Sequence, residues 1–212
     1  MSATAIAPPR ASVPLGPSGP LTYGDPTAYR WSVRQFDRLV TEGILTADDR
    51  VELLEGFVVA KMSRNPAHDN ALSVIAAVLF RIVPSGWWVR QQSAIRLSTS
   101  RPEPDFAIAR GDRSTYQTRH PSPADISLII EVADTSLSRD RIDKARIFAG
   151  EGIREYWIVN LSDNLVEVFQ EPSGPTGAPE FGRIKAHEAG QRIPWVLDGT
   201  LIAEVSVDEL LS

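Results

Sequence analysis

The sequence predicts an α/β (α+β) fold with a mixed central β-sheet flanked by helices. Three observations predict it. Strand-like apolar runs alternate with amphipathic helical segments, the run at 126–132 is apolar at nearly every position, and a helical segment separates that run from another strand at 156–160. A continuously apolar run is typical of a strand covered on both faces. Two strands joined by a helix are expected to lie parallel, with a right-handed crossover.

The first 30 residues differ in composition from the rest of the chain. They are rich in Ala, Pro, Ser and Gly and contain few large apolar side chains, too few to offset the entropy lost on ordering. They also lack the basic start and the apolar segment of a signal peptide. We predict a disordered tail over 1–30 and one folded domain over 31–212, which is long enough to bury a sizeable core.

The folded part is expected to begin with a helix capped by Ser32, which places Val33, Phe36, Leu39 and Val40 on one apolar face. The segments that follow are a hairpin over 51–62 turning at Glu55-Gly56, a helix over 67–83, and strands over 87–97 and 105–109. The apolar side of the second helix is expected to contain Leu72, Ile75, Ala76, Leu79, Phe80 and Val83.

The second half of the chain continues the alternation. The strand over 126–132 leads into a helix that Ser138 caps and that ends near Gly150. The apolar side of this helix is expected to contain Ile142, Ala145, Ile147, Phe148 and Ala149. Strands over 156–160 and 165–170, a Pro/Gly loop over 171–182, one or two further strands and a short terminal helix complete the chain.

The composition excludes several classes of protein. With 42% hydrophobic and 23% charged residues, the chain resembles ordinary soluble globular proteins. It has no apolar run of the roughly 20 residues that span a bilayer, and no cysteine for disulfides or thiolate metal sites. A net charge of −5 disfavours a nonspecific nucleic-acid coat, although the segments 101–119 and 139–154 concentrate arginines that suit phosphate contacts or a mixed-charge surface. We expect a cytoplasmic protein with no membrane attachment.

Three charged residues carry the strongest functional signal. Asp105 follows Pro104 at the start of a strand, Glu131 lies near the end of the apolar run, and Lys144 lies about two turns into the next helix. Carboxylates at the ends of apolar strands are costly to bury without a partner, and a divalent cation is one such partner. Because the chain has three lysines against nineteen arginines, a lysine beside two such acids is an informative feature.

Together these residues predict metal-assisted hydrolysis of a phosphodiester. Asp105 and Glu131 on neighbouring strands would hold Mg²⁺ or Mn²⁺ and leave positions for water and phosphate. The ammonium group of Lys144 would orient the water or help deprotonate it, and would stabilise the transition state. Simpler explanations exist: Asp105 opens a turn, Glu131 faces solvent, and Lys144 forms an exposed pair with Asp140 that contributes little to stability.

Two upstream residues are weaker candidates. Glu52 lies in a strand-like run and is a candidate third ligand, directly or through water. His68 opens the second helix and is a candidate contact for a metal-bound water or a phosphate, with a helix-start or surface histidine as the simpler interpretation. His120 and His187 lie in polar, loop-like segments and receive no role.

These residues resemble those of the Uma-two family of restriction-endonuclease-like proteins, within the PD-(D/E)XK nuclease superfamily. The resemblance covers about residues 30–211. The stretches that carry it are Val51-Glu52-Leu53-Leu54-Glu55-Gly56, His68 at a helix start, Pro104-Asp105, Ile130-Glu131-Val132-Ala133-Asp134, Asp140 with Lys144, and Gly152-Ile153-Arg154-Glu155-Tyr156-Trp157-Ile158-Val159. The Pro-Asp pair alone is a weak signal, and the later stretches are more specific.

The resemblance implies a restriction-endonuclease-like core, DNA as substrate, and Mg²⁺ or Mn²⁺ held by Asp105 and Glu131. Glu52 would match a further acidic position by analogy. The usual lysine of the superfamily falls two residues after the glutamate, where this chain has Ala133. The resemblance implies that Lys144, on the following helix, takes its place.

Three functional hypotheses remain at this point. A metal-dependent DNA endonuclease is favoured by Asp105, Glu131 and a nearby lysine occurring together. A non-catalytic nuclease-fold module for nucleic-acid binding or interaction is favoured by Ala133 and the acidic net charge. The third is a structural protein whose buried acids form internal ion pairs. Since cutting both strands of a duplex takes two active sites or two successive events, a homodimer is an expected assembly for the first hypothesis.

Overall fold

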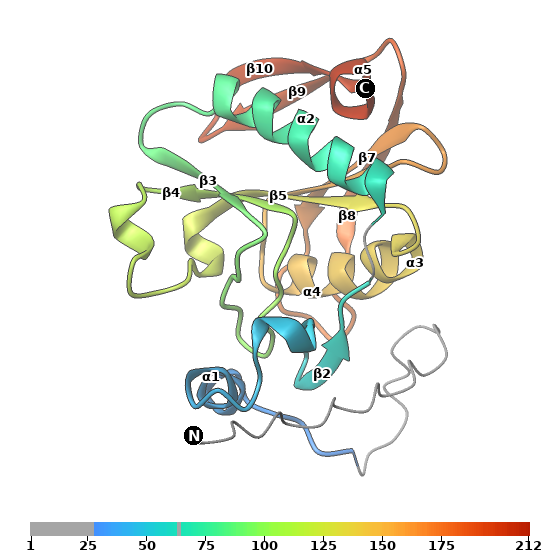
Figure 1. The fold of residues 1–212 in the computed structure, drawn as a ribbon. Helices are drawn as coiled ribbons and strands as arrows, with labels where there is room; N and C mark the ends of the chain where they lie inside the picture. Colours follow the sequence, from blue (N-terminus) through green and yellow to red (C-terminus); the bar gives the residue numbers. More distant parts are fainter. Residues whose placement is uncertain (1–27, 63–64) are drawn as a thin grey trace, which may run out of the picture.

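The computed structural model describes residues 28–62 and 65–212 (Figure 1). The tail expected over 1–30 lies almost entirely outside these residues, so the domain boundary at residue 30 stays a prediction. At the centre of the described part is a six-stranded sheet with the order β3-β4-β5-β6-β7-β8. Its strands are β3 (Trp87–Gln91), β4 (Phe106–Arg110), β5 (Ile126–Ala133), β6 (Glu155–Asn160), β7 (Leu165–Pro172) and β8 (Phe181–Glu188).

The sheet is mixed, as the sequence predicts. β5 and β6 are parallel, and the other neighbouring pairs are antiparallel. In the parallel pair, Glu131 lies opposite Ile158 and Ala133 opposite Asn160. The helical segment over 137–150 connects these two strands, so the expected strand–helix–strand unit is confirmed.

Helical layers cover both faces of the sheet (Figure 1). One face carries α2 (Pro66–Ile82), the hairpin of β9 (Arg192–Leu197) and β10 (Thr200–Ser206), and α5 (Val207–Leu211). The other face carries a continuous helical segment made of α3 (Leu137–Arg139), the π-helical turn η4 (Asp140–Lys144) and α4 (Ala145–Gly150). Beyond it lie α1 (Val33–Thr41) and the hairpin of β1 (Val51–Leu54) and β2 (Phe57–Ala60). Short 3-10 turns occur at η1 (Ala47–Asp49), η2 (Ser114–Tyr116) and η3 (Pro123–Asp125).

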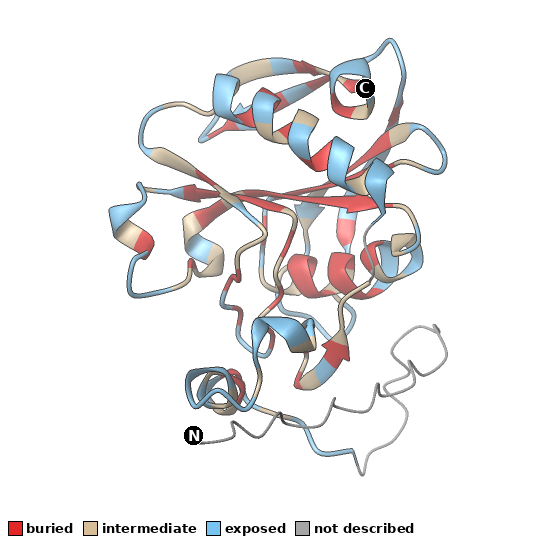
Figure 2. Ribbon diagram, viewed as in Figure 1, coloured by how far each residue is buried: buried red, intermediate tan, exposed pale blue. Residues whose placement is uncertain are grey.

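Strand β5 lies between the two larger hydrophobic clusters of the described residues. Leu128, Ile130 and Val132 pack towards α2 and the β9–β10 hairpin. Ile129 and Ala133 pack towards α4, because successive side chains of a strand point to opposite faces. All but one residue of the strand are buried, which explains its nearly continuous apolar sequence (Figure 2). Glu131 shares the α4 face with Ile129 and Ala133, so its carboxylate enters an apolar layer.

The β1–β2 hairpin is fastened to the segment that precedes β4. The N–H of Arg101 donates to the Leu53 carbonyl at 2.7 Å, and the N–H of Gly56 donates to the Thr99 carbonyl at 3.0 Å. Helix α1 begins at Ser32 as expected: the Gln35 N–H donates to Ser32 Oγ at 3.2 Å, and the Ser32 N–H donates to Gln35 Oε1 at 2.8 Å. These contacts fix the hairpin, and with it Glu52, against the central sheet.

Several local predictions are wrong. The strand expected over 87–97 ends at Gln91, because Gln92 has φ of +46° and its N–H donates to the Asp105 carbonyl at 2.9 Å. Phe80 is 62% exposed, since the buried side of α2 runs through Val78 and Leu79 and position 80 lies one step beyond it.

The C-terminal part and the helix after β5 also differ from expectation. Residues 181–206 contain three strands, β8, β9 and β10, in place of one or two. Ile142 is 53% exposed because it lies in η4, whose wider π-helical turn rotates the side chain out of the apolar face. His187, assigned to a loop-like segment, lies in β8 and is buried.

Gly56 provides a test of the hairpin turn. It has φ of +84°, and a Cβ added there would lie 2.7 Å from Arg30 Cβ and 3.1 Å from the Trp31 carbonyl oxygen. We expect Gly56→Ala to lower the free energy of unfolding by about 1–3 kcal/mol more than Gly190→Ala does. Gly190 is the matched control, because its φ is +82° and a Cβ there would meet nothing within 4 Å. Urea denaturation measures both variants, and equal losses would contradict the close approach.

Candidate functional site

The five residues singled out in the sequence line one pocket. Asp105, Glu131, Lys144, Glu52 and His68 surround a cavity of about 200 Å³ at the C-terminal end of β5. They come from the start of β4, from β5, from η4, from β1 and from the first turn of α2. The remaining lining residues are Arg50, Lys61, Met62, Gln92, Glu103, Val132, Ser136, Arg139 and Asp140.

Asp105 is held in the ionised form. It immediately precedes β4, and its Oδ2 accepts a hydrogen bond from the backbone N–H of Val132 at 2.9 Å. The same oxygen lies 3.3 Å from His68 Nε2. Burial opposes ionisation, but the bonds from His68 and Val132 outweigh it and hold the pKa of Asp105 below its usual value. This carboxylate therefore carries its charge at neutral pH.

The helix start of α2 places His68 beside that carboxylate. Asn65 caps the helix, and its Oδ1 accepts the backbone N–H of His68 at 2.9 Å. The imidazole is mostly buried, with 13% of its side chain exposed. His68 is thus a partly buried neighbour of Asp105. It does lie at the helix start, as one form of the simpler interpretation has it, but its side chain faces the pocket and is not that of an exposed surface histidine.

Glu131 and Lys144 form a buried ion pair. Lys144 Nζ lies 2.7 Å from Glu131 Oε1 and 3.4 Å from Asp140 Oδ1. Burial opposes the charge on Lys144, but Glu131, Glu52 and Asp140 outweigh it and raise the pKa of the amine well above its usual value. Burial likewise raises the pKa of Glu131 in spite of Lys144. Lys144 is therefore protonated at neutral pH, and its positive charge compensates the carboxyl groups of Glu131, Glu52 and Asp140.

The burial of Lys144 corrects two expectations. The residue is 7% exposed, so the exposed i,i+4 pair with Asp140 is wrong in its setting although the two residues do meet. The helix also begins at Leu137, one residue before the expected cap at Ser138. The hydroxyl of Ser136 donates to Asp140 Oδ2 at 2.5 Å, and the π-helical turn η4 brings Asp140 and Lys144 to the pocket side.

Glu52 reaches the pocket from the hairpin. It is 3% exposed, and its Oε2 accepts the backbone N–H of Glu103 at 3.1 Å. It lies close enough to Lys144 to raise the pKa of that amine. The structure therefore brings the weaker acidic candidate to the same cavity as Asp105 and Glu131.

Besides Lys144, three cationic residues line the pocket, and none of them was assigned individually to the site from the sequence: Arg50, Lys61 and Arg139. Arg139 belongs to an expected arginine-rich segment, and its guanidinium donates to the Ala60 carbonyl at 2.8 Å. Arg50 and Lys61 lie outside both segments and reach the pocket through the hairpin. Only the rarity of lysine in the chain could have pointed to Lys61. Six other arginines of these two segments do not line the pocket and pair with carboxylates instead: Arg101 with Asp37, Arg110 and Arg154 with Asp198, Arg119 with Asp125, Arg141 with Glu167, and Arg146 with Glu55.

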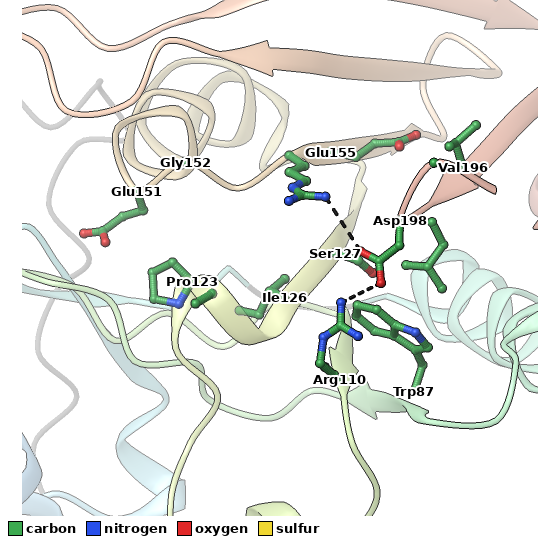
Figure 3. Close-up of a pocket in the computed structure, with 14 residues that line it drawn as sticks. Trp87, Arg110, Pro123, Ile126, Ser127, Glu151, Gly152, Glu155, Val196 and Asp198 are labelled. Atoms are coloured by element: carbon green, nitrogen blue, oxygen red, sulfur yellow. Dashed lines mark hydrogen bonds and ion pairs between the residues drawn. The ribbon is translucent and has the colours of Figure 1, made fainter. Parts of the chain in front are cut away.

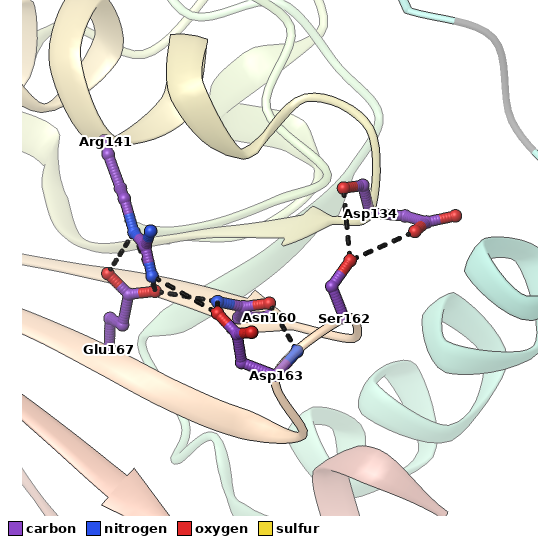
Figure 4. A network of polar contacts seen from close by, with 6 residues as sticks. All are labelled: Asp134, Arg141, Asn160, Ser162, Asp163 and Glu167. Atoms are coloured by element: carbon purple, nitrogen blue, oxygen red, sulfur yellow. Dashed lines mark hydrogen bonds and ion pairs between the residues drawn. The ribbon is translucent and has the colours of Figure 1, made fainter.

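Arg141 anchors the helix from a second side. Its guanidinium donates to Glu167 of β7, with the closest contact at 2.6 Å (Figure 4). Asn160 Nδ2 donates to the same Glu167 at 3.1 Å and to Asp163 at 2.9 Å. Arg141 and Lys144 therefore fix neighbouring positions of η4 to two different strands.

A larger pocket lies at the opposite end of β5. It has a volume of about 600 Å³ and is lined by Ile126 and Ser127 at the beginning of that strand (Figure 3). Asp198 lies 2.6 Å from Arg110 and 3.8 Å from Arg154. The charged side chains of this pocket therefore largely neutralise one another. The smaller pocket combines buried acids with a buried lysine, which makes it the better candidate for chemistry.

Comparison with known proteins identifies the family of the chain. The family described as "Uma2: Putative restriction endonuclease" matches residues 33–203. The chain belongs to the Uma2 family. A solved structure described as a putative nuclease from Anabaena variabilis has 12% sequence identity and a TM-score of 0.60, and the match covers 85% of this chain and 97% of that chain. At this identity the likeness shows the fold alone. The comparison with curated proteins found no match.

Membership in the Uma2 family confirms the resemblance seen in the sequence and supports a nuclease, a hydrolase acting on nucleic acid. The predicted α/β fold with a nuclease-like central sheet is likewise confirmed. Among the helices of the described residues, none is long and apolar enough to cross a membrane. Ala133, at the position of the usual superfamily lysine, is fully buried, and the amine nearest the Glu131 carboxylate in the pocket comes from Lys144.

Lys144 is expected to be important for stability in this Uma2 protein. Removing it in Lys144→Met leaves Glu131 buried without its cation, and breaking such a pair costs about 3–5 kcal/mol. The exposed Lys185→Met, on β8, is the matched control and should change the free energy of unfolding little.

The loss should depend on pH. Without Lys144 the folded-state pKa of Glu131 rises further, so the folded protein retains a proton that the unfolded chain releases. The free energy of unfolding of Lys144→Met should therefore fall as pH rises above the ordinary glutamate pKa, and the defect should be smaller at pH 5 than at pH 8. Urea denaturation at both pH values measures it, and a pH-independent loss would contradict the ion pair.

Proposed function

We propose that this Uma2 protein is a metal-dependent endonuclease that hydrolyses phosphodiester bonds in DNA. One observation carries the proposal: Asp105, directly before β4, and Glu131, on the paired strand β5, reach one cavity together with the buried amine of Lys144. A site of this kind, which joins two acids to a cation, suits the stabilisation of negative charge developing on a phosphate. Membership in the Uma2 family supports the same class of reaction.

The donor set of the pocket fits Mg²⁺ or Mn²⁺. Among residues 28–62 and 65–212, no three His, Cys, Asp or Glu side chains are arranged as a ready-made cage for an ion. Mg²⁺ does not require such a cage, because it is usually held by one or two carboxylates, water and substrate phosphates. Asp105 and Glu131 would hold the ion, and Glu52 would contact it directly or through water. When bound, the ion supplies an activated water and charge compensation at the phosphate.

The residues of the chain divide the remaining tasks. Because its pKa is raised, Lys144 stays protonated and acts as a donor to the negatively charged transition state rather than as the base that deprotonates water. His68 and the Val132 N–H keep Asp105 ionised and oriented. Arg139, Arg50 and Lys61 also line the cavity and would contact the phosphates of the DNA strand.

One observation favours a different role. The Glu131 carboxylate already has a cationic partner in Lys144, and a carboxylate so paired is less available to an ion. In that case the protein is a non-catalytic nuclease-fold module for nucleic-acid binding or interaction. DNA as the partner and a homodimer as the assembly stay predictions in both cases.

Cleavage of supercoiled plasmid tests the catalytic proposal. We expect the purified protein to nick the plasmid in Mg²⁺ or Mn²⁺ and to do so no longer in EDTA. Asp105→Asn should lower the rate at least about 100-fold, because it removes a charge that the proposed ion requires. Asp48→Asn replaces an exposed acid that does not line this pocket, and it should retain full activity. Equal activity of the two variants would exclude the proposed site.

Metal binding separates the catalytic proposal from the non-catalytic module. Calorimetric titration with Mn²⁺ should detect a site that is lost in the double variant Asp105→Ala, Glu131→Ala. The exposed acid Glu171→Ala serves as the control and should leave the titration unchanged. Binding that persists in the double variant would contradict the assignment of these two ligands.

A further inference from the structure

A second pocket adjoins the acidic one. It has a volume of about 650 Å³, and three of its lining residues, Arg50, Lys61 and Glu103, also line the acidic pocket. These three residues form a ridge between the two cavities. The second cavity is therefore the immediate neighbour of the place where we put the phosphodiester.

The ridge is a built structure with two cations on it. The backbone N–H of Lys61 donates to the Arg50 carbonyl at 2.8 Å, and the Arg50 guanidinium donates to the Met62 carbonyl at 3.1 Å. The Glu103 carboxylate pairs with Lys61, and its backbone N–H holds Glu52 at 3.1 Å. Arg50 and Lys61 thus face both cavities from a fixed position.

One part of the wall of the second pocket is apolar, and the guanidinium of Arg101 lies beside it. The rest of the wall is polar and includes Thr46, Asp69 and Glu103. Val40 and Leu45 expose part of their side chains in the apolar part, over the buried ring of Phe36. The guanidinium of Arg101 lies over that ring at 5.5 Å from its centroid and is held by Asp37 at 3.4 Å. Apolar side chains and a guanidinium plane are surfaces on which nucleic-acid bases stack.

We propose that this second pocket, lined by Phe36, Val40, Leu45 and Arg101, binds an unpaired base of the nucleotide next to the phosphodiester in the acidic pocket. Arg50 and Lys61 contact the phosphate that connects the two positions. The inference rests on the proposed function, and it specifies the substrate: a base inside a duplex is stacked and paired, so the pocket takes single-stranded or locally unpaired DNA.

Matched variants test the base pocket. Val40→Asp places a charge on the pocket wall, and Ile44→Asp places the same charge three residues from the end of α1 at a position that lines neither cavity. Both residues are exposed, at 38% and 52%, so both variants should fold, which their melting temperatures verify. The probe is a short fluorescent single-stranded oligodeoxynucleotide, titrated in Ca²⁺ and followed by anisotropy.

We expect Val40→Asp to weaken binding of the single strand about tenfold, and Ile44→Asp to leave it within about twofold. Replacing one base of the probe at a time by an abasic site should weaken binding to the unmodified protein at one position and have no effect there in Val40→Asp. Equal affinities of the two variants, or tighter binding of a blunt duplex than of the single strand, would overturn the base pocket.

These experiments distinguish failure of the base pocket from failure of the proposed nuclease function. Plasmid nicking by the unmodified protein, together with unchanged binding in Val40→Asp, would leave the nuclease in place and remove only the base pocket. If the unmodified protein neither binds nor cleaves any DNA, both proposals are overturned. Weaker single-strand binding in Val40→Asp alone supports the base pocket even if cleavage is absent.

Discussion

The ion pair between Glu131 and Lys144 is the interaction on which the organisation of the pocket depends. Glu131 projects from the almost wholly buried strand β5 into a layer formed by Ile129, Ala133 and the helix that packs against them. A carboxylate in such a layer needs a partner, because an unpaired buried charge costs several kcal/mol. Supplying that partner from a helix requires the helix to start close to the end of β5, and Leu137 begins it four residues after the strand.

The same constraint explains the unusual helical geometry. The π-helical turn over residues 140–144 places Asp140 and Lys144 together beside Glu131, and Ser136 holds Asp140 from the preceding turn. In the usual arrangement of the superfamily, the lysine would stand on the strand itself, two positions after the glutamate. Here that position is a small buried alanine that packs against α4, so the helix has room to approach the strand closely. The amine of Lys144 therefore reaches Glu131 from the helix that packs on the sheet, and not from the same strand.

The sequence predicted much of this fold because β5 and the helix after it have strong patterns. A strand that is apolar throughout, a helix with capping and stop signals, and a second strand of the same kind are local features that need no tertiary information. Asp105 and Glu131 could be found because acids interrupt apolar strands. The exposure of Phe80 and Ile142 could not, because a shift of one residue in helical phase decides which side of a helix is buried.

The burial of Lys144 and the roles of Arg50 and Lys61 depend on contacts between distant segments. Helical spacing alone suggests that Lys144 is an ordinary surface residue, and only the approach of η4 to β5 removes it from water. Arg50 and Lys61 reach the pocket because the β1–β2 hairpin is bonded to residues 99–103. No pattern within either segment encodes that pairing. The motifs in the sequence indicated the family. The ridge that Arg50 and Lys61 form with Glu103 becomes apparent only in the folded structure.

The double attachment of η4 has a consequence for the dynamics of the molecule. Lys144 ties this turn to β5, and Arg141 ties it to β7. A π-helical turn is a rare, local departure from the α-helix. Because opening here breaks two ion pairs on two strands, the backbone amides of residues 140–146 should exchange with solvent only on the timescale of sheet opening, and the amides of α1 should exchange much sooner. The most irregular helical turn of the protein is then among its slowest to open.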